Sequence, residues 1–136
     1  MVHPIADLQA SIVAALGADT QLVAAIGADA VFDMPPKGKR APYLVILRHD
    51  LVTRDTDILP GHDHRVQIQA WHADPSRAAV LVLAERVITV MESTDLSSST
   101  LSVSHIQLDR TETAIDRKSG QARALLVFRI FSEPAA

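Results

Sequence analysis

The stretch from His64 to Ser93 changes its hydrophobic period within a few residues, and this change constrains the fold more than any other feature of the chain. Its first part alternates apolar and polar residues, which is the period of a β-strand with one apolar face. Apolar residues then recur about every 3.6 positions, which predicts an amphipathic helix. We expect Asp74 to cap this helix and Pro75 to occupy its first position. The strand face is formed by Val66, Ile68 and Ala70, and the helix stripe by Val80, Leu83, Ala84, Val87 and Met91.

Two helices, an edge strand and a buried strand are expected before this unit. Gly17 and Gly27 are placed to end the two helices in a left-handed conformation, and Asp19 can cap the second one. In order, the expected elements are a helix from Ile5 to Leu16, a helix from Thr20 to Ile26, an edge strand from Ala30 to Asp33, a proline-rich loop from Met34 to Pro42 and a strand from Tyr43 to Arg48.

The remaining segments connect or extend a sheet. We interpret His49 to Asp63 as a long connection between antiparallel strands, and loops of this length are usually functional or become ordered on binding. Apolar residues change phase between Val103 and Ile106, which predicts a β-bulge near Ser104 or His105. A polar hairpin connection from Asp109 to Gln121 and a final strand from Ala122 to Phe131 complete the chain.

This order of elements predicts the fold class. The expected order is two helices, three strands, one crossover helix and two more strands, and most of the connections are hairpin-like. This order favours an α+β domain. We expect a mostly antiparallel sheet of about four to five strands with helices packed on one face. A chain of 136 residues is long enough for one core, so we assign residues 1–136 to a single domain.

The sheet is expected to have a second apolar face. Trp71 points away from the apolar face of its strand, and Leu125, Val127 and Phe131 alternate with another apolar set on the last strand. An uncovered apolar face usually marks a contact with another subunit. In the alternative interpretation the N-terminal helices cover this face and the protein is a three-layer monomer.

Composition excludes several classes of function. The net charge of -3 gives no general attraction to nucleic acid or to an anionic membrane surface. The chain has no Cys, so it has neither a disulfide framework nor a thiolate metal site. No apolar run approaches the roughly 20 residues of a membrane-spanning helix. We expect a soluble protein that contacts no membrane.

Candidate chemistry is sparse. His62 and His64 point the same way in an extended chain and could share a metal ion with Asp63 or Asp57 nearby, but the chain offers no convincing third ligand elsewhere. The chain also lacks a phosphate-binding loop, a nucleophile elbow and a paired buried carboxylate, so we expect no catalysis, no metal and no cofactor. The remaining candidates are contact residues for a subunit or partner: Trp71, Leu125, Val127, Phe131, Ile58, Leu59, Lys37, Lys39 and Arg40.

Two groups among these candidates differ in kind. The basic loop residues Lys37, Lys39 and Arg40 either form a solvated loop or dock onto an acidic surface. Ile58 and Leu59 lie in a polar connection that cannot bury enough apolar area to order itself. We therefore expect the segment from Leu51 to His62 to be mobile in the free subunit and to become ordered on assembly.

The pattern of the whole chain resembles a known family. The similarity is carried by Leu16–Asp19, Gln21–Gly27, Ala30–Asp33, Ala41–Ile46, the strand Val66–Trp71, the helix Asp74–Met91 and the strand Ala122–Phe131. Together these resemble the small tail-completion or tail-terminator proteins of long-tailed phages, prophages and phage-derived gene transfer agents. The acidic, His-bearing connection from His49 to Asp63 is longer than a plain hairpin needs.

The resemblance implies a structural protein and not an enzyme. It implies a homo-oligomeric ring, as a hexamer, at the head-proximal end of a tail tube, where the ring ends tube polymerisation and joins the tail to the neck. The implied partners are the tail tube protein and a neck or head-completion protein; DNA can pass through the ring without sequence-specific contact. The protein would assemble in the host cytoplasm and then belong to the virion. The alternatives are a head-completion or connector ring, and a small metal-dependent enzyme using His62 and His64.

Overall fold

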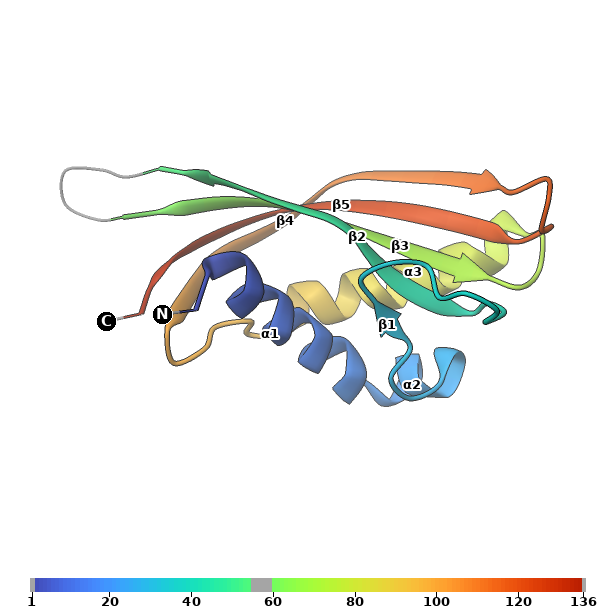
Figure 1. Cartoon of the computed structure of the whole chain (residues 1–136), viewed down its shortest axis with the longest axis horizontal. Coiled ribbons are helices and arrows are strands. Elements are labelled where there is room, and N and C mark those ends of the chain that lie inside the picture. Colours follow the sequence, from blue (N-terminus) through green and yellow to red (C-terminus); the bar gives the residue numbers. More distant parts are fainter. Residues whose placement is uncertain (1, 55–59, 136) are drawn as a thin grey trace.

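The computed structural model describes residues 2–54 and 60–135, and within them the chain forms two layers (Figure 1). One layer is a five-stranded sheet and the other consists of three helices. The elements are α1 (Pro4–Ala18), α2 (Thr20–Ile26), β1 (Val31–Phe32), β2 (Tyr43–Thr53), β3 (His62–His72), α3 (Arg77–Ser93), β4 (Leu101–Ile115) and β5 (Ala122–Pro134). The predicted order of elements is therefore confirmed.

The strands lie in the order β1-β2-β3-β5-β4. Only β1 runs parallel to its neighbour; it is a short edge strand that pairs with β2 through Val31 with Leu44 and Phe32 with Val45. All other neighbours pair antiparallel, with β5 between β3 and β4. This arrangement confirms the predicted α+β class with a mostly antiparallel sheet.

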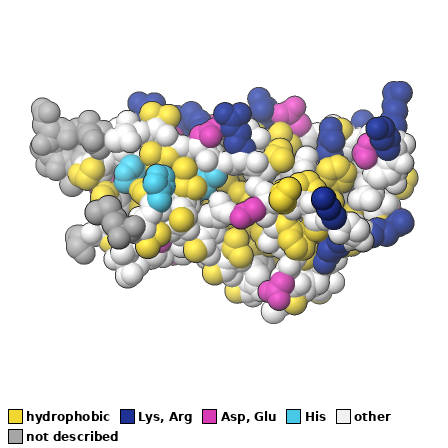
Figure 2. Space-filling view, in the orientation of Figure 1, with side chains coloured by type: hydrophobic (Ala, Val, Ile, Leu, Met, Phe, Trp, Pro, Cys, Tyr) yellow, Lys and Arg dark blue, Asp and Glu magenta, His cyan; other side chains and the backbone are white. Residues whose placement is uncertain are grey.

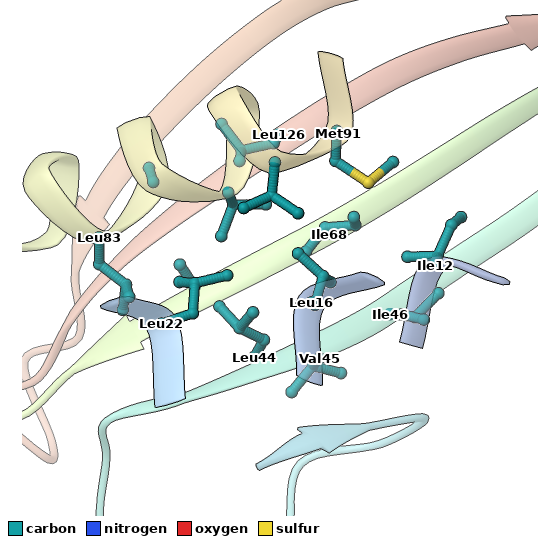
Figure 3. Close-up of a cluster of buried hydrophobic side chains, with 14 of the residues drawn as sticks. Ile12, Leu16, Leu22, Leu44, Val45, Ile46, Ile68, Leu83, Met91 and Leu126 are labelled. Carbon is teal, nitrogen blue, oxygen red and sulfur yellow. The ribbon is translucent and has the colours of Figure 1, made fainter. Parts of the chain in front are cut away.

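All three helices lie on one side of the sheet (Figure 1). Beneath them, the inward residues of β3 and β5 are fully buried, as the alternation predicts. Leu16 of α1 and Met91 of α3 point into the same cluster as Ile68 of β3 and Leu126 of β5 (Figure 3). The N-terminal helices therefore share this face with α3, and the three-layer alternative is wrong. We call this side the helix-covered face and the other side the helix-free face.

The helix ends follow the sequence in some places and depart from it in others. α2 has the predicted cap at Asp19 and ends at Gly27, whose φ is 89°. α1 continues through Gly17 to Ala18, so the predicted glycine end is wrong. No single helix of the described residues is long and apolar enough to cross a membrane; α1 and α2 meet that test only as a pair bent by 82°.

The cap of α3 also differs from the prediction. Ser76, and not Asp74, is the N-cap, and its hydroxyl accepts a hydrogen bond from the Ala79 amide. The Asp74 carbonyl instead accepts the amide of Ser76 and the amide of Ala122 at the start of β5. Asp74 is thus held in the turn before the helix by a contact with a distant strand.

The strands are longer than predicted. β2 continues to Thr53 and β3 begins at His62, so residues 49–53 and 62–63 of the expected 49–63 connection belong to a paired hairpin. β4 continues to Ile115, which shortens the expected 109–121 connection to residues 116–121. The predicted bulge is confirmed, because the β4–β5 register shifts between Val103 and His105.

Candidate assembly interface

A row of aromatic side chains crosses one end of the helix-free face. Phe32 of β1 and Tyr43 of β2 meet edge to face with ring centroids 6.0 Å apart, and Tyr43 lies 6.3 Å from Trp71 of β3. A cation closes each end of the row: Lys39 lies 5.5 Å from the Phe32 centroid, and Arg123 of β5 lies 5.7 Å from the Trp71 centroid. The register explains the row, because Tyr43, Trp71 and Arg123 are direct cross-strand neighbours.

Trp71 has the orientation that its sequence phase predicts. It is half-buried on the helix-free face, and its indole Nε1 donates a hydrogen bond to Gln69 Oε1 at 2.8 Å. The polar atom of the ring is therefore satisfied within the chain, whereas part of its apolar surface remains in solvent. A Trp of this kind can contribute apolar area to a contact without a desolvation penalty on its N–H group.

The same end of the sheet gathers positive charge. The 33–42 connection and the β4–β5 turn both lie here, and their exposed Lys and Arg side chains form no ion pair with the described residues. In Figure 2 dark blue side chains gather at the right-hand end of the molecule, where the β4–β5 turn lies. We call this surface the basic end; it consists of Lys37, Lys39, Arg40, Arg117, Lys118 and Arg123 together with Trp71.

The middle of the helix-free face is apolar along β5 and polar around it. Leu125 and Val127 are half-buried and lie opposite Gln69 and Gln67 of β3. Cations here have carboxylate partners, unlike those of the basic end. The pairs are Arg48 with Asp50 at 2.6 Å, Arg65 with Asp109 at 3.3 Å and Arg110 with Glu112 at 2.8 Å.

At the hairpin end of this face, a buried carboxylate is held by two guanidinium groups. Asp63 is 3% exposed and accepts hydrogen bonds from Arg129 Nη2 at 2.8 Å and Arg54 Nε at 3.1 Å. Burial alone would raise the pKa of Asp63, but the hydrogen bonds from Arg129 and Arg54, together with the charges of Arg129 and Arg65, outweigh it and lower that pKa. This cluster ties the hairpin to β5.

Phe131 also belongs to the hairpin end and packs within the chain. A Cβ atom placed on Gly61 would lie 2.8 Å from Phe131 Cζ and 2.8 Å from the Arg54 carbonyl oxygen. Only glycine therefore allows the Phe131 ring to approach the backbone this closely. Of the predicted contact residues, Ile58 and Leu59 lie outside the residues that the structure describes.

His62 and His64 lie on the helix-covered side of the hairpin and not in a loop. His64 is fully buried; its Nδ1 atom lies 2.8 Å from His49 Nε2, and its Nε2 atom lies 2.8 Å from Ser132 Oγ. Both ring nitrogens of His64 are therefore engaged. Within residues 2–54 and 60–135, no group of three or more His, Asp and Glu is placed to hold a metal ion. The arrangement gives the metal-enzyme alternative no support.

Burial sets the protonation of this histidine pair. Desolvation lowers the pKa of His49 to about 4 and that of His64 to about 4. Asp50 opposes the shift at His49, and Asp63 opposes it at His64, whereas His3 adds to both shifts. The pair is therefore neutral near pH 7, and we regard it as a structural network.

The outer side of the helical layer carries a groove that sequence inspection missed. Between α2 and α3 lies a depression of about 700 Å³ that includes Leu81, which is 41% exposed, and Val82, which is 74% exposed. Glu85 and Arg86 also line it. Leu81 and Val82 are visible in the sequence as apolar residues outside the main helix stripe. They indicate a groove only when the position of α2 beside α3 is known.

Comparison with known proteins identifies relatives over almost the whole chain. Residues 10–133 match the family described as tail completion protein gp17. A solved structure titled "Virion of native gene transfer agent (GTA) particle" contains a chain with the same fold. The two chains are 26% identical with a TM-score of 0.82, over 97% of this chain and 99% of that one. No curated protein matches the sequence.

Proposed function

We propose a specific role for this chain, which belongs to the tail completion protein gp17 family and so serves a structural function in a phage-type tail. It assembles as a ring, in the form of a hexamer, at the head-proximal end of the tail tube. The ring ends tube polymerisation and joins the tail to the neck or head-completion protein. The protein assembles in the host cytoplasm and then remains in the particle as a virion component.

The observation that carries this proposal is the family match over residues 10–133. The similarity to a chain of a gene transfer agent virion supports it, because the two chains cover each other almost completely. The description of the family as tail completion also favours the tail over a head-completion or connector role. Both findings concern the complete fold and not a shared motif.

The helix-free face supports the proposed assembly. It carries half-buried apolar side chains at Trp71, Leu125 and Val127 and a set of cations without carboxylate partners in the described residues. A ring of identical subunits uses one patch against a different patch on the neighbour. The two faces of this sheet provide two such surfaces, one apolar and basic and the other helical.

A change on the helix-free face tests the proposal directly. We expect Leu125→Glu to leave the fold intact, because the side chain is only half-buried, and to abolish ring formation by placing a charge in the contact. Val13→Glu is the matched control, because Val13 is 38% exposed on α1. Electron microscopy and light scattering, with and without tail tube protein, measure the assembly. A wild-type protein that stays monomeric in the presence of tubes would refute the proposed function.

A further inference from the structure

The outer groove between α2 and α3 is a preformed surface. Asp19 caps α2 by accepting the Leu22 amide at 3.0 Å, and the same carboxylate pairs with Arg86 of α3 through contacts of 2.6 and 2.8 Å. A bidentate pair of this kind fixes geometry as well as adding energy. The two walls of the groove are therefore tied together, and Leu81, Val82 and Glu85 are held at its opening.

Charge is divided unequally between the two layers. Residues 2–30 and 73–100, which form the helices and their flanking turns, contain seven carboxylates and two Arg, for a net charge of -5. The rest of the chain contains nine carboxylates and eleven Lys or Arg, for a net charge of +2. Six of the seven Lys and Arg residues without an ion pair in the described residues lie at the basic end, and the seventh is Arg77 of α3. One copy can therefore offer a positive surface to the negative layer of another.

We propose that the basic end of one copy binds the α2–α3 groove of the next copy. This inference rests on the proposed function and names the two surfaces that meet in the ring. Trp71 and the methylene groups beside it would cover Leu81 and Val82, while Arg123 would approach Glu85. Leu81 and Val82 are apolar residues in solvent on a helix whose other apolar residues face the core, so a partner explains their exposure.

The positions of the two surfaces suit a ring. The groove is lined by Pro42 and His72, so it lies at the same end of the sheet as Tyr43 and Trp71 but on the helical side. The basic end and the groove thus face opposite directions at one end of the molecule. A contact between them is heterologous and can repeat in one sense until the ring closes. A contact between two helix-free faces would be isologous and would stop at a dimer.

Charge reversal distinguishes these arrangements. Glu85→Lys and Arg123→Glu should each weaken ring formation by about tenfold or more, because each places like charges in every contact. An equal mixture of the two variants should form rings again, since alternating subunits restore an opposite pair at each contact. Glu92→Lys is the control, one exposed carboxylate further along α3. If both single variants form rings as the wild type does, or if the mixture stays impaired, the proposal is wrong.

Cross-linking gives a second, independent measurement. The chain has no Cys, so single cysteines can be introduced without a background reaction. Ala114 is the neighbour of Arg123 on β4, and Val82 lies in the groove. With an added mild oxidant such as oxidised glutathione, a mixture of Val82→Cys and Ala114→Cys should give disulfide-linked dimers under ring-forming conditions, and neither variant should do so alone. Dimers of Ala114→Cys alone would indicate face-to-face contact and overturn the proposal.

The two proposals fail in different ways. Rings of wild-type protein without the mixed cross-link would leave the ring function standing and refute only this contact. If the cations instead bind nucleic acid, Arg123→Glu would reduce retention of a duplex DNA probe but would leave ring formation unchanged. That result would also overturn the proposed contact. A wild-type protein that forms no ring on tubes would refute both.

Discussion

The two faces of β5 are built from similar residues and have different environments. Ala124, Leu126, Phe128 and Ile130 face the helices and are fully buried, whereas Leu125, Val127 and Phe131 face the other way and are half-buried. Composition therefore does not distinguish the faces of this strand. The difference lies in what covers them: the helical layer completes one face within the chain, and the other face retains apolar surface for which the described chain has no cover.

The two ends of the helix-free face differ in a related way. At the hairpin end, Asp63 holds Arg54 and Arg129, so charges compensate each other within the chain. At the basic end, Arg123 stacks on Trp71 and forms no salt bridge with a carboxylate of the described residues, although its charge acts on nearby Asp116. We infer that the hairpin end is stabilised internally and that the basic end serves a contact.

The largest effect is expected on the helix-covered face. Val87 is fully buried on α3, so Val87→Asp would bury an unpaired carboxylate at a cost of several kcal/mol. A domain of this size has only about 5 to 15 kcal/mol of stability, so the variant should be largely unfolded. Val82→Asp, on the same helix but 74% exposed, is the matched control and should fold. Circular dichroism with urea titration measures both; a cooperatively folded Val87→Asp would contradict the assignment of this stripe.

The second largest effect is expected at low pH, where acid should destabilise the buried network of His49 and His64. The folded pKa of His64 is about 4, below the 6.5 of the unfolded chain, so the unfolded state binds the proton first as pH falls. The free energy of unfolding is therefore unaffected above pH 6.5 and decreases between pH 6.5 and about 4, by on the order of 3 kcal/mol for this residue. Urea titrations at several pH values measure the slope.

His64→Gln identifies the source of that slope. The variant removes the titrating group, so the decrease in stability between pH 6.5 and 4 should become smaller, although the protein should be less stable than the wild type near pH 7, where the hydrogen bonds of His64 are lost without that gain. His105→Gln serves as control because His105 is exposed on β4. An unchanged slope in His64→Gln would mean that this histidine is already protonated, or solvated, in the folded protein.

A smaller effect is expected at the hairpin end. Asp63→Asn removes the carboxylate that Arg54 and Arg129 share, and we expect a loss of about 1 to 3 kcal/mol because both guanidinium groups can reach solvent. The lowered pKa of Asp63 means that its contribution is present above the unfolded pKa and is lost as pH falls through the lower, folded value. Asp50→Asn removes the exposed pair with Arg48 and a charge that acts on His49, and near pH 7, where His49 is neutral, it should change stability by less than about 1 kcal/mol.

Local sequence patterns predicted those elements whose signals lie within a few residues. The cap at Asp19 and the end at Gly27 are both present in α2, and the change of apolar phase after Val103 located the β4 bulge. The patterns failed where hydrogen bonds come from distant segments. The sequence predicts a polar connection at Thr111 and Thr113, but both residues pair with β5 and belong to strand β4.

The candidate interface could be predicted only in part. The phase of Trp71 on its strand correctly placed it away from the helices, and the basic loop was visible as Lys37, Lys39 and Arg40. Arg123 was missed, because its position beside Trp71 depends on the register of β3 with β5. The groove was missed for the same kind of reason, since it exists only after two helices that are distant in sequence dock against each other.

The smallest change in stability, combined with a large change in assembly, is expected at Trp71. Trp71→Gln removes a half-buried ring that contacts Tyr43 and Arg123 and packs against the edge of the core from the helix-free side, so the free energy of unfolding should fall by only about 1 to 2 kcal/mol. Assembly should fall much further, because aromatic residues at the centre of a contact often contribute most of its binding energy. Trp71→Phe keeps an aromatic ring, although a smaller one without the N–H group, and should retain most of the assembly. Urea titration and light scattering on the same samples compare the two effects. If Trp71→Gln lost stability and assembly in proportion, Trp71 would be a core residue, and the helix-free face would have no separate role at this end of the sheet.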